Sequence, residues 1–325
     1  CSFIKWFKPK YNIKLLNMKK IIYTAFICAL ISSCEVIEGP YMNDVIVPID
    51  TGSSEFVKNI LIEDFTGHLC KNCPDAAREL DAIHDFYGSR IIGLALHVGT
   101  TFGRPYPSDI SANPDQKFIY DFRTSEGEEL DNFFQVSQNG LPKGMVNRID
   151  YSSENHRKDY GQWLAIVSDE LDKEVQLGIT INSTISGNTG DINITTEALS
   201  TLTGNYKLVV CLAENQIINW QKDGNVDDAS YIHQHVLRTI LTPTWGEDLS
   251  VEGSYIDDGD IFEHSYSINL IDLENQNIQH SQDVLVQGNG NAGDWESTNM
   301  NVIAYIYDAS NYEILQVEYT SLLAK

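Results

Sequence analysis

Two cysteines stand close together in the stretch FTGHLCKNCP, at residues 70 and 73, and Pro74 follows them directly. Apolar residues then recur at helical spacing, which predicts that the pair lies at the start of a helix. The free N–H groups and the dipole of a helix N-terminus stabilise a thiolate and lower the pKa of a cysteine there. We therefore expect redox chemistry, with Cys70 as the nucleophile and Cys73 as the thiol that resolves a mixed disulfide.

Two other interpretations of the cysteine pair are open. An exported CxxC pair can oxidise to a stable disulfide that holds the chain together and never turns over. A tetrahedral zinc site takes four ligands, and near the pair the sequence adds only His68. We therefore expect no metal and no cofactor, and the structural disulfide is the alternative to exchange chemistry.

Asp64 and Pro142 stand where a thioredoxin-like domain has functional residues. Asp64 lies at the end of an expected strand, six residues before Cys70, and Pro142 follows Gly-Leu just before another strand pattern. This part of the sequence resembles a thioredoxin-like domain. The resemblance implies that Asp64 is a buried acid assisting proton transfer at the resolving sulfur, and that Pro142 is a cis-proline facing the disulfide. The sequence departs from thioredoxins at Leu69 and at residues 71–72, so the resemblance leaves the substrate open.

The elements around the pair alternate between strand and helix. Strand patterns over residues 57–65 and 90–99 flank the helix, which predicts a βαβ unit with parallel strands. An amphipathic pattern over residues 159–174 predicts a closing helix. From residue 175 onward the sequence changes to short strand patterns separated by Gly, Asn and Asp turns, which are typical of a β-sandwich.

The first 55 residues have the features of export and anchoring segments. Residues 18–33 combine a basic start, a short apolar core and small residues before Cys34, as in bacterial lipoprotein signal peptides. The apolar core is too short to span a bilayer. We expect Cys34 to carry the lipid, with residues 34–55 as a tether and residues 1–17 as a non-native upstream extension. A cleaved secretory signal with an incidental Cys34 is the alternative.

The charge balance excludes one class of partner. The chain has a formal net charge of −24, and the expected signal and upstream segments contain lysines but no acidic residue. The mature protein is therefore still more acidic and repels the phosphates of nucleic acids and anionic lipid headgroups. We expect no nucleic-acid partner.

Two polar motifs in the second half offer further candidate sites. The stretch YIHQHVLR predicts a strand with His233 and His235 on one face, but two ligands do not make a metal site. We expect these histidines to lie on the surface or to be hydrogen-bonded. Residues 223–228, DGNVDD, are spaced like the start of a calcium loop but lack the glycine and the glutamate that such a loop requires. A polar hairpin loop is the expectation there, with calcium as the alternative.

Several motifs together resemble one family. The signal ending at Cys34, the stretches LIEDFTGHLCKNCP and NGLPKGMVNR, Asn219-Trp220 before YIHQHVLR, and the closing VIAYIYDASNYEILQVE are similar to the twenty-eight-kilodalton outer-membrane protein family of the Bacteroidota. The resemblance implies an outer-membrane lipoprotein. It also implies an α/β thioredoxin-like domain over residues 56–174, followed by an all-β immunoglobulin-like sandwich over residues 175–325.

Two functions fit these features. The first is thiol-disulfide exchange on exported proteins by a lipid-anchored protein. The second is a non-enzymatic cell-surface lipoprotein that binds a protein or glycan, with the cysteine pair as a structural disulfide. An exposed Cys70 with a cis Pro142 packed against it would favour the first, and a buried Cys70 would favour the second. A calcium-dependent adhesin is a third interpretation, resting on residues 223–228 alone.

Overall fold

The computed structural model describes residues 56–250 and 255–322, which belong to one compact unit spanning Ser54–Lys325. The upstream extension, the signal segment and the tether that begins at Cys34 lie outside the described residues, so the expectations for them stay predictions. Within the described part of the chain, no helix is long and apolar enough to cross a membrane. The described fold is mixed α/β, with several sheets and a few helices.

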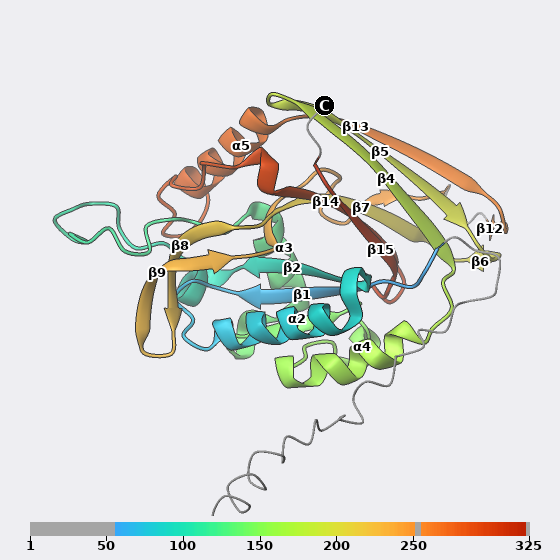
Figure 1. The fold of residues 1–325 in the computed structure, drawn as a ribbon, viewed down its shortest axis with the longest axis horizontal. Coiled ribbons are helices and arrows are strands. Elements are labelled where there is room, and N and C mark those ends of the chain that lie inside the picture. Colours follow the sequence, from blue (N-terminus) through green and yellow to red (C-terminus); the bar gives the residue numbers. More distant parts are fainter. Residues whose placement is uncertain (1–55, 251–254, 323–325) are drawn as a thin grey trace, which may run out of the picture. The chain divides into compact units, whose positions relative to one another are not determined.

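The largest sheet has eight strands (Figure 1). Its order is β15-β14-β7-β10-β2-β1-β3, and β11 pairs with β7 as a side branch. β1 and β2 are parallel, and β3 is antiparallel to β1. β10 is parallel to β2 on one side and antiparallel to β7 on the other. The strands are β1 (Ile60–Thr66), β2 (Ile91–His97), β3 (Lys143–Val146), β7 (Tyr206–Glu214), β10 (Val236–Ile240), β11 (Glu247–Asp248), β14 (Met300–Asp308) and β15 (Ile314–Ser321).

Smaller sheets and four helices complete the described fold. A three-stranded sheet has the order β13-β5-β4, and two pairs of strands, β6 with β12 and β8 with β9, form ladders of their own. These strands are β4 (Leu177–Ser186), β5 (Thr189–Ala198), β6 (Leu202–Thr203), β8 (Ile217–Asp223), β9 (Val226–His233), β12 (Tyr255–Ile256) and β13 (Ile261–Asn269). The helices are α2 (Cys73–Tyr87), α3 (Ser125–Phe134), α4 (Trp163–Leu171) and α5 (Leu270–Asp283).

The strand β1 is buried along its whole length because both of its faces are covered. Ile60 and Ile62 point to the face covered by α2 and α4, which Figure 1 shows on the same side of the sheet. Leu61 and Phe65 point to the other face, where they join a core that includes residues of α3. Side chains alternate between the faces of a strand, so Asp64 lies on the same face as Ile60 and Ile62, under α2.

The side chains of the strand β7 also point alternately into two different cores. Val209 and Cys211 belong to the core that contains Leu61 and Phe65 of β1. Leu208 and Val210, which alternate with them, belong to a second core shared with the three-stranded sheet. The main sheet is therefore packed against β4, β5 and β13 on one side of β7, and this second core resembles the interior of a sandwich.

The structure confirms the elements expected around the cysteine pair and changes several expected further on. Strands over residues 57–65 and 90–99 appear as β1 and β2, with α2 between them. The stretch YIHQHVLR is not one strand, because β9 ends at His233 and β10 begins at Val236. The helix α5 was not expected, since residues after 175 were interpreted as all β.

The expected boundary between residues 174 and 175 lies in the connection between α4 and β4. Strands from both sides of it are hydrogen-bonded in the eight-stranded sheet. The core around Leu61 likewise includes residues from both sides of the boundary. The described residues on the two sides are therefore parts of one compact unit.

Candidate functional site

The cysteine pair is oxidised and lies at the start of α2. Cys70 and Cys73 form a disulfide with an S–S distance of 2.17 Å. Cys73 is the first residue of the helix, and Pro74 lies in its first turn. Both cysteines are buried, each with only 2% of its surface exposed. A buried Cys70 is the feature expected of a structural disulfide, so this observation favours that interpretation over exchange chemistry.

The loop before the disulfide is held against the segment that follows β2. The amide of Leu69 donates to the carbonyl of Phe102 at 3.0 Å, and His68 Nε2 is 2.8 Å from the carbonyl of Arg104. A Cβ at Gly67 would lie 2.5 Å from the Phe102 backbone, so only glycine fits this close approach. The loop is therefore fixed before it reaches Cys70.

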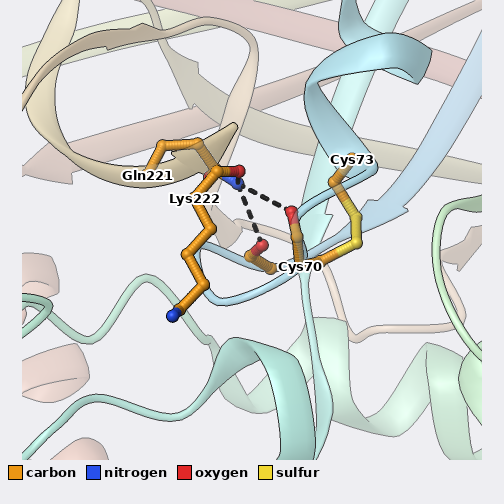
Figure 2. The surroundings of a disulfide bond; sticks show 5 residues. Cys70, Cys73, Gln221 and Lys222 are labelled. Atoms are coloured by element: carbon orange, nitrogen blue, oxygen red, sulfur yellow. Dashed lines mark hydrogen bonds between the residues drawn. A yellow bond between two sulfur atoms is a disulfide. The ribbon is translucent and has the colours of Figure 1, made fainter. Parts of the chain in front are cut away.

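The hairpin formed by β8 and β9 covers the other side of this loop. The Gln221 side-chain amide donates to the carbonyl of Cys70 at 3.1 Å and more weakly to that of Gly67 at 3.4 Å, as Figure 2 shows beside the disulfide. The backbone amides of Lys222 and Gly224 also donate to carbonyls of the loop. These contacts come from a segment about 150 residues away in the sequence, and they place the hairpin against the backbone of Cys70.

Asp64 and Cys73 line the same small cavity. The cavity has a volume of about 50 Å³, and its walls come from β1, β2, α2 and the end of β9. Asp64 is almost fully buried, and its Oδ1 has no hydrogen-bond partner among the described residues. Burial raises the pKa of this carboxyl to about 7. A carboxyl in this state can give or take a proton near neutral pH.

Two buried histidines line the cavity with Asp64. His97 ends β2, and His233 ends β9; their rings are 5.5 Å apart, and both contact the ring of Phe122. Burial lowers the pKa of His233 to about 3 and lowers that of His97 well below its ordinary value. Both rings are therefore neutral near pH 7. Neither nitrogen of His97 has a hydrogen-bond partner within the described residues, and the same holds for His233 Nε2.

Pro142 lies at the same edge of the sheet as the disulfide loop. The Leu141–Pro142 bond is cis, which is the isomer that the resemblance implied. The next residue, Lys143, pairs with Phe65 near the carboxyl end of β1. The four residues expected to form the site, Asp64, Cys70, Cys73 and Pro142, therefore all lie at or beyond this end of β1.

The polar motif over residues 223–228 has an ordinary role in the structure. Gly224 and Asn225 form the turn between β8 and β9, as expected for a hairpin loop. Asp223 accepts from Arg78 at 3.0 Å, and Asp227 lies within 4 Å of the Lys117 and Lys222 ammonium groups. Across the described residues, no cluster of three or more His, Cys, Asp or Glu side chains could hold a metal ion.

The expectation for the two histidines of YIHQHVLR needs correction. His233 and His235 do not share a face of one strand, because His235 lies in the connection between β9 and β10 with a positive φ of 58°. His233 is buried beside the cavity rather than on the surface, and its ring is hydrogen-bonded to the backbone of β8 at Asn219 and Trp220, which was the other alternative. Sequence reasoning also missed Gln221, His97 and Tyr231 as neighbours of the disulfide. For His97, one signal for a place near the site was available in the sequence, because this residue ends the strand that pairs with β1.

The chain was compared with known families and structures. The model of the family "Outer membrane protein Omp28" matches residues 128–293, which is just over half of the chain. The chain belongs to the Omp28 family of outer-membrane proteins. It is thus a protein of the cell envelope, associated with the outer membrane, as the sequence resemblance implied. Attachment of a lipid at Cys34 stays a prediction.

Solved structures of low identity share parts of the fold. HBP35 of Porphyromonas gingivalis has 19% sequence identity and a TM-score of 0.55, with 83% of this chain and 76% of that chain covered. A domain of the outer membrane lipoprotein Omp28 from the same organism has 14% identity and a TM-score of 0.27, covering 46% of this chain and 91% of that one. The first likeness supports a common fold, and the second adds no argument about it. No curated protein matches the chain.

Proposed function

We propose that this Omp28-family protein carries out thiol-disulfide exchange on exported proteins through Cys70 and Cys73. The observation that carries the proposal is Asp64, a buried carboxyl without a hydrogen-bond partner for Oδ1 among the described residues, in the same cavity as Cys73. Burying such a group destabilises a protein, and a structural disulfide has no use for it. A carboxyl with a raised pKa beside a reactive sulfur is typical of functional sites.

The proposed reaction follows from the positions of the two sulfurs. A substrate thiolate attacks Cys70 Sγ, the S–S bond breaks, and a mixed disulfide forms between the substrate and Cys70. Cys73 leaves as a thiolate and takes the proton of the Asp64 carboxyl. A second substrate thiolate then attacks the substrate sulfur and releases Cys70 as a thiolate. The substrate is oxidised to a disulfide, and the cysteine pair receives two electrons; the reverse sequence reduces a substrate.

The proposal includes the finer assignment of the fold. We assign residues 56–174 to a thioredoxin-like arrangement, supported by parallel β1 and β2, antiparallel β3, and α2 beginning at the disulfide. We assign the strands after residue 175 to an immunoglobulin-like sandwich, supported by the packing of β4, β5 and β13 on the main sheet. The sandwich is interrupted by α5 and shares its main sheet with the first segment.

A second function has one specific observation in its favour. Cys70 and Cys73 are each only 2% exposed, as expected for a structural disulfide in a non-enzymatic surface lipoprotein. In that case the remaining surface would bind a protein or glycan at the outer membrane. The two functions differ in whether Cys70 ever forms a bond with another protein.

Trapping in cells that make the protein distinguishes these functions. In a Cys73→Ser variant, Cys70 can still form a mixed disulfide with a substrate, but no second thiol is present to resolve it. We expect this variant to accumulate covalent adducts that a reducing agent removes, and a Cys70→Ser variant to accumulate far fewer. Cys211 is fully buried and does not complicate the comparison. Equal adduct levels in the two variants, or none in either, would contradict the exchange function.

A further inference from the structure

The β8–β9 hairpin is attached to the rest of the fold through side-chain contacts and a few hydrogen bonds, without strand pairing to the main sheet. Its two strands pair only with each other in the described structure and do not join the eight-stranded sheet. Ile218, Val226 and Ile232 are all exposed, so the hairpin buries little apolar surface through these side chains. An isolated two-stranded hairpin is marginally stable in water. Its position therefore depends on its contacts with the disulfide loop, on the packing of Trp220 and His233 against Phe118 and Phe122, and on its connection to β10.

Gln221 is the buried contact between the hairpin and the loop. Its side chain is 2% exposed, whereas most residues of β8 and β9 are partly or fully exposed. Its amide nitrogen donates to the carbonyls of Cys70 and Gly67, the residues on either side of the loop's turn. The same nitrogen also lies 3.0 Å from the Lys222 carbonyl within the hairpin, so its two N–H donors are shared among three acceptors. The lost hydrogen bonds would leave two buried carbonyls without this partner.

The other polar contacts of the hairpin with the loop and α2 include two backbone hydrogen bonds and one exposed ion pair. Its side chains also pack on aromatic rings, since Trp220 lies 5.7 Å from Phe118 and His233 lies 4.5 Å from Phe122. The backbone amide of Lys222 donates to the carbonyl of His68 at 2.9 Å, and the backbone amide of Gly224 donates to the carbonyl of Lys71 at 2.8 Å. Arg78 and Asp223 form an ion pair at 3.0 Å, but both side chains are more than a third exposed. Exposed ion pairs contribute little to stability. Gln221 is therefore the side chain whose hydrogen bonds hold the hairpin to the disulfide loop.

We propose that the β8–β9 hairpin is a lid over the Cys70–Cys73 disulfide and that Gln221 is the positioning residue that holds it closed. The lid covers Cys70 in the described state and lifts by local opening, which exposes the sulfur and frees the loop carbonyls. A partner chain can then donate to the carbonyls of His68 and Lys71 in place of the hairpin. The purpose of the lid rests on the proposed function, but its opening can be measured without a protein substrate.

Reduction of the disulfide by dithiothreitol tests the proposal in the whole protein. One thiolate of the reagent attacks Cys70 Sγ and expels Cys73 as a thiolate, which takes up a proton. The second thiol of the reagent then releases Cys70 and closes the oxidised reagent, so two electrons pass to the protein. If attack requires opening, the observed rate is proportional to the fraction of open lid.

We expect Gln221→Ala to be reduced roughly tenfold faster than the wild type, because the loss of one or two buried hydrogen bonds favours the open lid. Asn225→Ala is the matched control, since Asn225 lies at the exposed turn of the same hairpin and its side chain makes no hydrogen bond found among the described residues. The control should be reduced at the wild-type rate. Equal rates for Gln221→Ala and the wild type would overturn the role of Gln221.

Hydrogen exchange of the wild-type protein gives a second test that needs no variant. The amides of Lys222 and Gly224 donate to the loop, so a lid that opens locally should exchange them without global unfolding. We expect their protection factors to be at least roughly tenfold lower than those of β7, which is paired on both sides. Equal protection of these amides and β7 would show that the hairpin is a fixed wall, and it would overturn the lid.

The outcomes separate the lid from the proposed function. If the lid opens but Cys73→Ser traps no partner, the lid stands and the exchange function fails. If Cys73→Ser traps partners while Gln221→Ala leaves the reduction rate unchanged, the function stands and Gln221 is not its gate.

Discussion

Asp64 shows how a single buried group connects the stability of this protein to its proposed chemistry. Burial raises its pKa to about 7, whereas an aspartate in an unfolded chain has its ordinary pKa of about 3.8. Between these values the folded protein keeps a proton that the unfolded chain has lost. The contribution of Asp64 to the stability of the folded protein therefore falls as the pH rises from about 4 to about 7, by up to about 4 kcal/mol.

Asp64→Asn should remove this pH dependence, because an amide of nearly the same shape does not ionise. We expect the variant to be more stable than the wild type at pH 8 and to have similar stability at pH 4. Denaturant unfolding of the oxidised protein at both pH values measures the difference. Asp115→Asn, at an exposed position, is the control and should show no such change. A stability difference that is the same at both pH values would contradict the raised pKa.

Sequence reasoning found some residues of the site and missed others for a physical reason. Cys70, Cys73 and Asp64 could be predicted because they lie within ten residues of one another, on a strand, a turn and a helix with clear local patterns. Gln221 and His233 could not be predicted, since they lie near the disulfide only because a hairpin distant in the sequence packs there. Their approach depends on tertiary packing, which a single sequence does not specify locally.

At the scale of elements, the buried side chain of Arg148 links β1 to β14. Both carboxylate oxygens of Glu63 accept from Arg148, at 2.6 and 2.8 Å. Arg148 also donates to the hydroxyl of Tyr305 on β14 at 2.8 Å. All three residues are essentially inaccessible to solvent. Arg148 thus connects the strand that carries Asp64 to a strand from the second half of the chain.

Glu63→Gln should destabilise the protein by about 3–5 kcal/mol, because it leaves the buried charge of Arg148 without a compensating carboxylate. Denaturant unfolding at pH 7 measures the change in the free energy of unfolding. Asp248→Asn is the control, since its ion pair with Lys207 is partly exposed and should contribute less than about 1 kcal/mol. Losses of the same small size in both variants would contradict this account of the buried pair.

The elements themselves could be predicted to different degrees. β1, β2 and α2 have strong patterns, since continuous apolar runs and helical spacing identify them directly. The stretch YIHQHVLR has the pattern of a single strand, because the break at residues 234–235 carries no glycine or proline signal. The helix α5 lies in a polar sequence, LIDLENQNIQHSQD, and its apolar residues are too few for a clear helical pattern.

At the scale of the whole molecule, the two halves of the sequence build one sheet. β2 pairs with β1 on one side and with β10 on the other, although β10 is about 140 residues further along the chain. The change in pattern near residue 175 was visible in the sequence, but strand pairing over such a distance was not. The same arrangement brings the β8–β9 hairpin over the disulfide, so the proposed lid and the continuous sheet have a common origin in the chain path.

The reduction potential of the Cys70–Cys73 pair, measured in the purified protein by equilibration with glutathione at pH 7, tests the central claim most directly. Thiol-disulfide exchange predicts a potential between about −270 and −120 mV, the range of proteins that pass electrons between thiols. A potential below about −300 mV would contradict the account, because a disulfide of that stability holds the chain together and does not exchange.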